Sequence, residues 1–283
     1  MSKIEKALKR AEQKRRSILT GGALEEKLSE TSARQKEEAK PRPLVKNIRY
    51  TQTRKIQVDR EVLARKKVMV IQNGRSRAAE EYRLLKAQVL KKARDKGWNV
   101  LMVTSAGRGE GKTLTAINLA LAISREVNET SLLVEADLRQ PSIEGYFGLR
   151  GEPGLTDHLL RNRPLPDVLI NPEIDRFVFL PGGKSIPNSA ETLGSPKMQD
   201  LVAEMKRRYP DRYVIFDVPP LFECSDPLVL SEYVDGVLLV VEACKTTTDH
   251  LKRAMELLEG KKIIGTVLNK VRGTDKRYYR YYR

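Results

Sequence analysis

The chain has 283 residues, of which 40% are hydrophobic, and a formal net charge of +16. This is enough for one substantial core of about 200 residues with extensions. Two cysteines and two histidines exclude a disulfide framework and show no metal-ligand spacing, which favours a reduced cytoplasmic location. No uncharged apolar run approaches the roughly 20 residues that cross a bilayer, so we expect any membrane association to be peripheral or through a partner.

The basic charge lies at the two ends of the chain. Residues 1–75 contain 21 Lys and Arg against 9 Asp and Glu, and residues 271–283 contain 5 against 1, whereas residues 76–270 contain 27 of each. This distribution predicts flexible basic arms rather than a basic groove, so no specific nucleic-acid binding is expected. An acidic partner, nucleic acid or an anionic lipid surface could each attract such arms.

The N-terminal region, residues 1–75, is expected to contain a short basic helix and a flexible linker. Apolar residues recur at helical spacing within 3–16, which favours a solvated amphipathic helix over a membrane anchor. Residues 20–65 combine Gly, Pro and many charges with few large apolar residues, and this composition is typical of a linker without its own core.

From about residue 76 the pattern becomes that of an α/β domain. A helical period runs from Ala78 to Asp95, and short apolar runs then alternate with helical patterns. The expected strands are 100–104, 131–135, 177–180, 213–217, 236–241 and 263–268, and the expected helices 112–125, 196–208, 226–232 and 247–259. This alternation predicts a mostly parallel sheet with helices on both faces and a ligand site at the carboxyl ends of the strands.

A phosphate-binding loop (P-loop) follows the first of these strands. The segment AGRGEGKT lies between a predicted strand and an apolar helix, where backbone N–H groups and the helix N-terminus can bind a triphosphate. We expect Lys112 to reach the β- and γ-phosphates and Thr113 to hold Mg²⁺. The expected nucleotide-binding residues are Ala106, Gly107, Arg108, Gly109, Glu110, Gly111, Lys112, Thr113 and Leu114.

Two further strands end in carboxylates. Glu135 and Asp137 follow the apolar run ending at Val134, and Asp217 follows the run ending at Phe216. A carboxylate at the carboxyl end of an apolar strand beside a P-loop can bind Mg²⁺ directly or through water. Each could also be an ordinary loop carboxylate, but two such strand ends in one P-loop domain favour metal and phosphate chemistry.

Four of the ten tyrosines lie in the last six residues: Tyr278, Tyr279, Tyr281 and Tyr282. They alternate with arginines in a segment, 271–283, that has no following segment to pack over it. Two interpretations are open at this point. The tail could dock on a neighbouring subunit, or its hydroxyls could accept phosphate.

These motifs together resemble the bacterial tyrosine kinases of exopolysaccharide synthesis, which are similar to the MinD/ParA class of P-loop ATPases. The resemblance covers about residues 76–283 and rests on AGRGEGKT, LLVEADLRQP, VIFDVPP, PNSAETLGS and the tail RYYRYYR. The charged N-terminal region is most similar to cytoplasmic autokinases of exosortase-linked loci. The resemblance implies an Mg-ATP-dependent kinase that phosphorylates its own tail in trans, with Lys112, Glu135, Asp137 and Asp217 as catalytic residues and Glu135 or Asp137 as the proton acceptor.

The resemblance also implies assembly and partners. Glu80, Arg83 and Lys86 fall where the family has a helix, here 76–96, that joins subunits in a ring. A membrane activator of the chain-length-determinant type is the implied partner. The sequence departs from the family pattern at three positions, with Glu135 in place of Asp, Arg108 in place of Pro and Lys86 in place of Arg. The signature lysine of the MinD/ParA class would fall at position 107, where this chain has Gly107, so that lysine is absent. The alternatives are a MinD/ParA-like regulatory ATPase and a scaffold without kinase activity.

Overall fold

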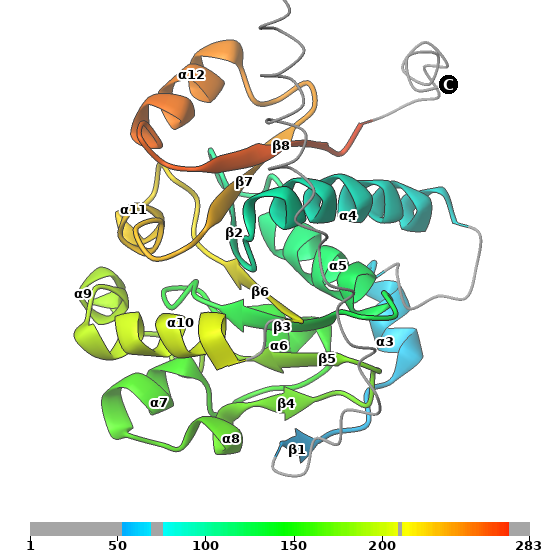
Figure 1. The fold of residues 1–283 in the computed structure, drawn as a ribbon, viewed down its shortest axis with the longest axis vertical. Helices are drawn as coiled ribbons and strands as arrows, with labels where there is room; N and C mark the ends of the chain where they lie inside the picture. Colours follow the sequence, from blue (N-terminus) through cyan, green and yellow to red (C-terminus); the bar gives the residue numbers. More distant parts are fainter. Residues whose placement is uncertain (1–52, 69–75, 209–210, 272–283) are drawn as a thin grey trace, which may run out of the picture. The chain divides into compact units, whose positions relative to one another are not determined.

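Apolar strands form the centre of a mostly parallel sheet (Figure 1). The computed structural model describes residues 53–68, 76–208 and 211–271, which lie within one compact unit, Leu44–Arg283. Its six main strands are β2 (Val100–Ser105), β3 (Thr130–Glu135), β5 (Phe177–Leu180), β6 (Arg212–Asp217), β7 (Gly236–Glu242) and β8 (Ile263–Asn269). All six were predicted, with bounds that differ by at most one residue, and the α/β fold is confirmed.

The order of the strands places the predicted site residues on one edge. The order is β1-β4-β5-β3-β6-β2-β7-β8, with the short strands β1 (Arg54–Lys55) and β4 (Ile170–Asn171) at one side. Only β4 and β5 are antiparallel among the described strands. Because β6 lies between β2 and β3, Asp217 is in register with Glu135 on one neighbour and Val103 on the other.

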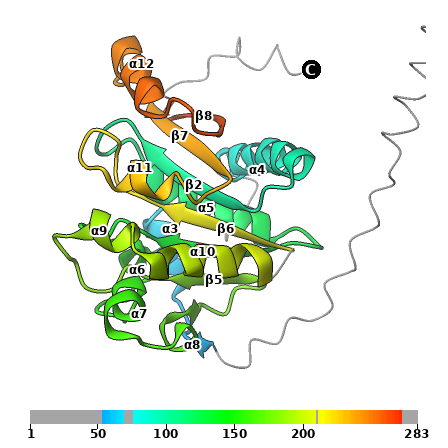
Figure 2. The same cartoon turned by 60° about the vertical axis from the view of Figure 1, so that its left-hand side comes forward.

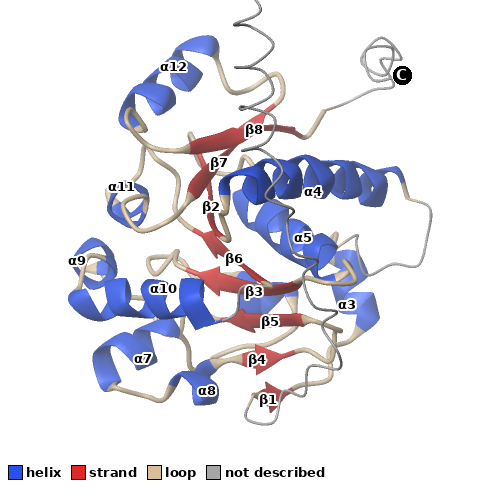
Figure 3. Cartoon of the chain, in the orientation of Figure 1, coloured by secondary structure: helices blue, strands red, loops and turns tan. Residues whose placement is uncertain are grey.

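Helices cover both faces of the sheet, as Figure 2 and Figure 3 show. Successive strand residues point to opposite faces, so Val100 and Met102 join one core while Leu101 and Val103 join the other. The second core is covered by α3 (Arg60–Arg65), α4 (Arg77–Lys96), α5 (Lys112–Ser124) and α6 (Ile143–Tyr146). The first is covered by α7 (Leu155–Arg161), α8 (Leu165–Val168), α9 (Ser189–Leu193), α10 (Pro196–Arg208), α11 (Asp226–Leu230) and α12 (Thr248–Leu257).

Helix α4 begins and ends where its sequence predicts. The Ser76 hydroxyl accepts a hydrogen bond from the Ala79 backbone N–H at 3.2 Å, and Gly97 ends the helix in the left-handed region with φ 67°. The buried residues Val89, Leu90 and Ala93 contribute to the core that also contains α5. The helical period predicted for 78–95 is therefore confirmed.

The folded part begins earlier than the sequence predicted. Residues 20–65 were expected to be a linker, but β1 pairs in parallel with β4, and Leu63 of α3 is only 1% exposed. Val68 is fully buried, and the Lys67 carbonyl accepts a hydrogen bond from Asn118 Nδ2 at 3.3 Å. The linker interpretation is therefore wrong for residues 54–65, because a few isolated apolar side chains here complete an existing core. The helix predicted for 3–16 lies outside the described residues.

Candidate active site

The P-loop turns from β2 into α5 through two left-handed glycines. Gly109 has φ 75° and Gly111 has φ 97°, a region that side chains strongly disfavour. A Cβ atom on Gly111 would also lie 2.1 Å from Asn269 Nδ2. Glycine is therefore required at the residue before Lys112, the first residue of α5.

Side chains from the ends of β7 and β8 hold the outer carbonyls of this loop. Asn269 Nδ2 donates to the Glu110 carbonyl at 2.8 Å, Lys270 Nζ to the Gly109 carbonyl at 2.6 Å, and Lys245 Nζ to the Arg108 carbonyl at 3.4 Å. We call these three side chains the carbonyl anchors. With the carbonyls bound on this side, the loop can present its N–H groups to an anion on the other.

Two carboxylates support the anchored loop. Buried Glu110 accepts a hydrogen bond from the Gly107 N–H at 3.0 Å and another from the Thr246 hydroxyl. Partly buried Glu242 lies 3.1 Å from Lys270 Nζ and 3.2 Å from Lys245 Nζ. The hydrogen bond from Lys270 lowers the pKa of Glu242 below its usual value, with a further contribution from Lys245. Glu242 therefore remains ionised beside both lysines.

The carbonyl anchors were not predicted from the sequence. Their positions could have been noticed, because residues at the carboxyl ends of parallel strands share the edge on which the P-loop lies. Lys245 and Lys270 are ordinary surface lysines in sequence, however, and Asn269 is not part of any motif recognised above. Their contacts with the P-loop are visible only in the fold.

Removal of an anchor should weaken nucleotide binding. We expect Lys270→Ala to raise the Kd for ADP about 5-fold to 10-fold, because a charge-assisted hydrogen bond to the Gly109 carbonyl is lost. Isothermal titration calorimetry checks the change, and Lys270→Arg should recover part of it. The matched control is Lys252→Ala, which changes an exposed lysine of α12. An unchanged Kd in Lys270→Ala would contradict the role given to the anchor.

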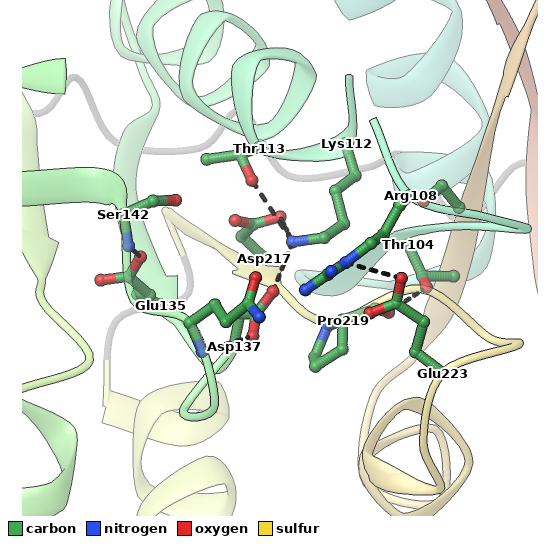
Figure 4. A network of polar contacts seen from close by, with 12 residues as sticks. Thr104, Arg108, Lys112, Thr113, Glu135, Asp137, Ser142, Asp217, Pro219 and Glu223 are labelled. Carbon is green, nitrogen blue, oxygen red and sulfur yellow. Dashed lines mark hydrogen bonds and ion pairs between the residues drawn. The ribbon is translucent and has the colours of Figure 1, made fainter. Parts of the chain in front are cut away.

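Three predicted catalytic residues lie together at the start of α5 (Figure 4). Lys112 Nζ is 2.9 Å from Asp137 Oδ2, 3.4 Å from Asp217 Oδ1 and 3.3 Å from the Thr113 hydroxyl oxygen. Burial disfavours the charged form of Lys112, but the negative charges of Asp217 and Asp137 outweigh burial and raise its pKa. Lys112 is therefore an ammonium group that two carboxylates hold at the P-loop.

The same cluster has the ligands that Mg²⁺ prefers. Asp217 is fully buried, burial raises its pKa, and its Oδ2 atom has no hydrogen-bond partner among the described residues. With Asp137 and the Thr113 hydroxyl, this oxygen forms an all-oxygen donor set that fits Mg²⁺. Among the described residues no group of three or more His, Cys, Asp or Glu could hold a metal ion. Phosphate or water oxygens would therefore have to complete the coordination.

Glu135 does not join this cluster. Its side chain is fully buried, and burial raises its pKa to about 7, against the opposing effect of backbone hydrogen bonds. Oε1 accepts from the N–H groups of Ser142 and Ile143, the latter at 2.7 Å, and Oε2 accepts from the Gly182 N–H at 2.9 Å. Figure 4 shows Glu135 directed toward Ser142 and away from Lys112. Both carboxylate oxygens are thus engaged in holding two loops.

Glu135→Ala should therefore destabilise the fold. We expect a loss of at least about 1–3 kcal/mol of unfolding free energy, because three backbone N–H groups lose their acceptor. The comparison is Glu144→Ala, which removes an acceptor from the backbone of Gly151 and Glu152 in a more accessible loop where water can replace it. Urea unfolding measures both variants. Equal losses would show that the buried position of Glu135 has no special importance.

The other predicted P-loop residues have contacts of their own. Ala106 is 1% exposed, and its carbonyl accepts a hydrogen bond from the Phe222 N–H at 3.2 Å. The Leu114 carbonyl accepts from Asn118 Nδ2 at 3.1 Å within α5. Arg108 forms an ion pair with Glu223 at 2.8 Å.

The residues predicted for subunit contacts lie on α4. Arg83 forms an ion pair with Glu80 on an exposed face, whereas Lys86 pairs with Glu126 of the same chain, just beyond the end of α5. The tail tyrosines lie outside the described residues. No helix in the described ranges, 53–68, 76–208 and 211–271, has the length and apolar character that crossing a bilayer requires.

Comparison with known proteins assigns the chain to a protein family. Residues 101–283 match the model of the CobQ/CobB/MinD/ParA nucleotide binding domain. Tyrosine-protein kinase YwqD of Bacillus subtilis (strain 168) is 31% identical over 217 residues, which cover 76% of this chain and 90% of that protein. The chain belongs to the bacterial tyrosine kinases.

Solved structures agree with this membership. The chimerical protein CapA2B2 aligns with a TM-score of 0.68 and 28% identity, covering 77% of this chain and 93% of that one. The kinase domain of Escherichia coli tyrosine kinase ETK aligns with a TM-score of 0.67 and 25% identity, covering 78% and 92%. These matches confirm the predicted nucleotide-binding fold and the predicted membership of the bacterial tyrosine kinase family.

Proposed function

We propose that the protein is an ATP-dependent protein-tyrosine kinase that phosphorylates its own C-terminal tyrosines in trans. The observation that carries the proposal is the cluster of Lys112, Asp137 and Asp217 at the P-loop of a chain from the tyrosine kinase family. The proposed acceptors are the four tail tyrosines, Tyr278, Tyr279, Tyr281 and Tyr282.

In this proposal the P-loop residues 106–114 bind the phosphates of ATP. Thr113, Asp137 and Asp217 are the residues that would hold Mg²⁺, which neutralises phosphate charge when bound. Lys112 exchanges one carboxylate contact for a phosphate oxygen. Asp217 Oδ2 has no hydrogen-bond partner in the described part of the chain, which supports the assignment, because a fully buried carboxylate oxygen requires a partner.

Transfer needs one bond to form and one to break. The tyrosine oxygen bonds to the γ-phosphorus, the bond to the bridging oxygen breaks, ADP leaves and the hydroxyl proton moves to a carboxylate. We assign that proton to Asp137, whose side chain is 11% exposed at the cluster. Glu135, expected from the sequence as an alternative acceptor, has both oxygens bound to backbone N–H groups and is assigned a positioning role instead.

Delivery from a neighbouring subunit suits the length of the tail. From Val271 to Tyr278 is seven residues, which span at most about 25 Å when extended. We propose that Glu80, Arg83 and Lys86 contribute to the subunit contact that brings a tail to the next site. The exposed Glu80–Arg83 pair can exchange partners for such a contact at little cost.

We further propose, from the family resemblance, that the kinase regulates the synthesis or export of an exopolysaccharide. It would act in the cytoplasm at the inner membrane, through a membrane activator of the chain-length-determinant type. The domain organisation in this proposal has three parts: an N-terminal arm, a kinase domain that also includes residues 54–68, and the tyrosine tail from residue 271. The arm is the region of the chain with the largest excess of positive charge.

The test is incubation of the purified protein with Mg-ATP, followed by mass spectrometry of the tail peptides. Phosphate on the tail tyrosines, absent when all four are changed to Phe, is the expected result. The assay is repeated with the cytoplasmic segment of a family activator added. If ATP is hydrolysed in both assays but no phosphate appears on the tail, the result would favour the second candidate, a regulatory ATPase. The match to the MinD/ParA-containing family model supports that candidate. If the protein neither hydrolyses ATP nor forms phosphotyrosine, the result would favour a scaffold without kinase activity.

A further inference from the structure

An ion pair connects the two loops that border the Lys112 cluster. Arg108 Nε of the P-loop lies 2.8 Å from Glu223 Oε1, in the segment between β6 and α11. The side chains of Arg108 and Glu223 are 60% and 33% exposed. Figure 4 shows the Arg108 guanidinium pointing toward the region where Lys112 and Asp137 meet. Arg108 is thus a second P-loop cation directed at the phosphate side of the loop.

The charges of the Lys112 cluster favour an additional cation, such as Arg108, when a triphosphate binds. Lys112 is shared by Asp137 and Asp217, so without the proposed Mg²⁺ the three side chains carry a net negative charge. Lys245 and Lys270 lie beside Glu242 and donate to loop carbonyls. A nucleoside triphosphate that enters the site would therefore benefit from a further positive group near its terminal phosphate.

The pair with Glu223 is easily exchanged. Ion pairs between exposed side chains contribute little to stability, because water solvates both partners well. A guanidinium binds a phosphate through paired hydrogen bonds, and a terminal phosphate carries more charge than one carboxylate. Arg108 can therefore leave Glu223 for a phosphate at small cost.

We propose that the side chain of Arg108, within the loop already proposed to bind phosphate, contacts the terminal phosphate of ATP, and that Glu223 competes with this phosphate for its guanidinium. The inference rests on the proposed use of ATP but not on transfer to tyrosine. It makes Glu223 an internal competitor, so the two members of one ion pair should affect nucleotide affinity in opposite directions. A purely structural pair would not behave in this way.

The experiment measures affinity in the full chain with Mg²⁺, using a non-hydrolysable ATP analogue and ADP. We expect Arg108→Ala to raise the Kd of the analogue about 10-fold, the effect of a charge-assisted hydrogen bond, and to change that of ADP less than about 2-fold. Glu223→Gln should lower the Kd of the analogue by about 2-fold to 5-fold. The control is Arg208→Ala, which breaks an exposed ion pair with Glu204 on α10.

Three outcomes would overturn the inference. Equal losses for the analogue and ADP in Arg108→Ala would remove the terminal phosphate as the contact. Weaker binding in Glu223→Gln would make the pair a structural link between the loops. Full affinity in Arg108→Ala would remove the contact altogether. Arg108→Lys keeps the charge and tests the same site if Arg108→Ala folds poorly. Wild-type binding without tail phosphate would instead count against the kinase proposal.

Discussion

Replacement of Lys112 by Met is expected to reduce tail phosphorylation at least about 100-fold, the usual cost of losing one charge-stabilising donor in an active site. Lys112 is the ammonium that both Asp137 and Asp217 contact, and the proposal moves it to the transferred phosphate. The initial rate of phosphotyrosine formation with Mg-ATP measures the effect. Lys92→Met is the matched control, since Lys92 donates to the Ile264 carbonyl at 2.9 Å and does not contact the P-loop in the structure.

Stability must be measured beside activity in this variant. Lys112→Met leaves Asp137 and the fully buried Asp217 without their ammonium partner, and breaking a buried ion pair costs about 3–5 kcal/mol. We expect Mg²⁺ to raise the melting temperature of the variant more than that of the wild type, because it supplies the missing positive charge. A Lys112→Met protein that remains folded and retains a tenth of the wild-type rate would contradict the assignment.

Mixing two inactive variants is expected to restore phosphorylation. A Lys112→Met chain keeps its tail tyrosines but lacks catalysis, and a chain with all four tail tyrosines changed to Phe keeps catalysis but lacks acceptors. Transfer between subunits predicts phosphate on the Lys112→Met chain in the mixture and on neither chain alone. The mass of the two chains differs, so intact-mass spectrometry identifies which one is modified.

The mixing experiment has its own control. In the same mixture, Glu80→Ala and Arg83→Ala introduced into both chains should reduce transfer if α4 forms the subunit contact, while nucleotide affinity stays unchanged. Phosphate that forms in the wild type but not in the mixture would indicate transfer within one chain. In that case the trans mechanism would be abandoned, but the assignment of Lys112 would stand.

The sequence predicted the part of the site that depends on strand ends. Asp137 and Asp217 were expected near Lys112 because apolar runs place them at the edge of a parallel sheet, and the structure confirms this juxtaposition. The side-chain direction of Glu135 could not be predicted, since it depends on three N–H groups supplied by two later loops. Residues 54–68 were missed because a few apolar side chains among many charges give no periodic signal.

The positions of the carbonyl anchors limit where a truncation of the tail can begin. Asn269 and Lys270 immediately precede the segment with the proposed acceptor tyrosines, yet they hold the carbonyls of Glu110 and Gly109. A deletion that starts at residue 269 would remove the proposed phosphate acceptors and also distort the P-loop. A resulting loss of ATP binding would then be mistaken for an effect of the missing tyrosines. Truncations that end after Val271 separate these two effects.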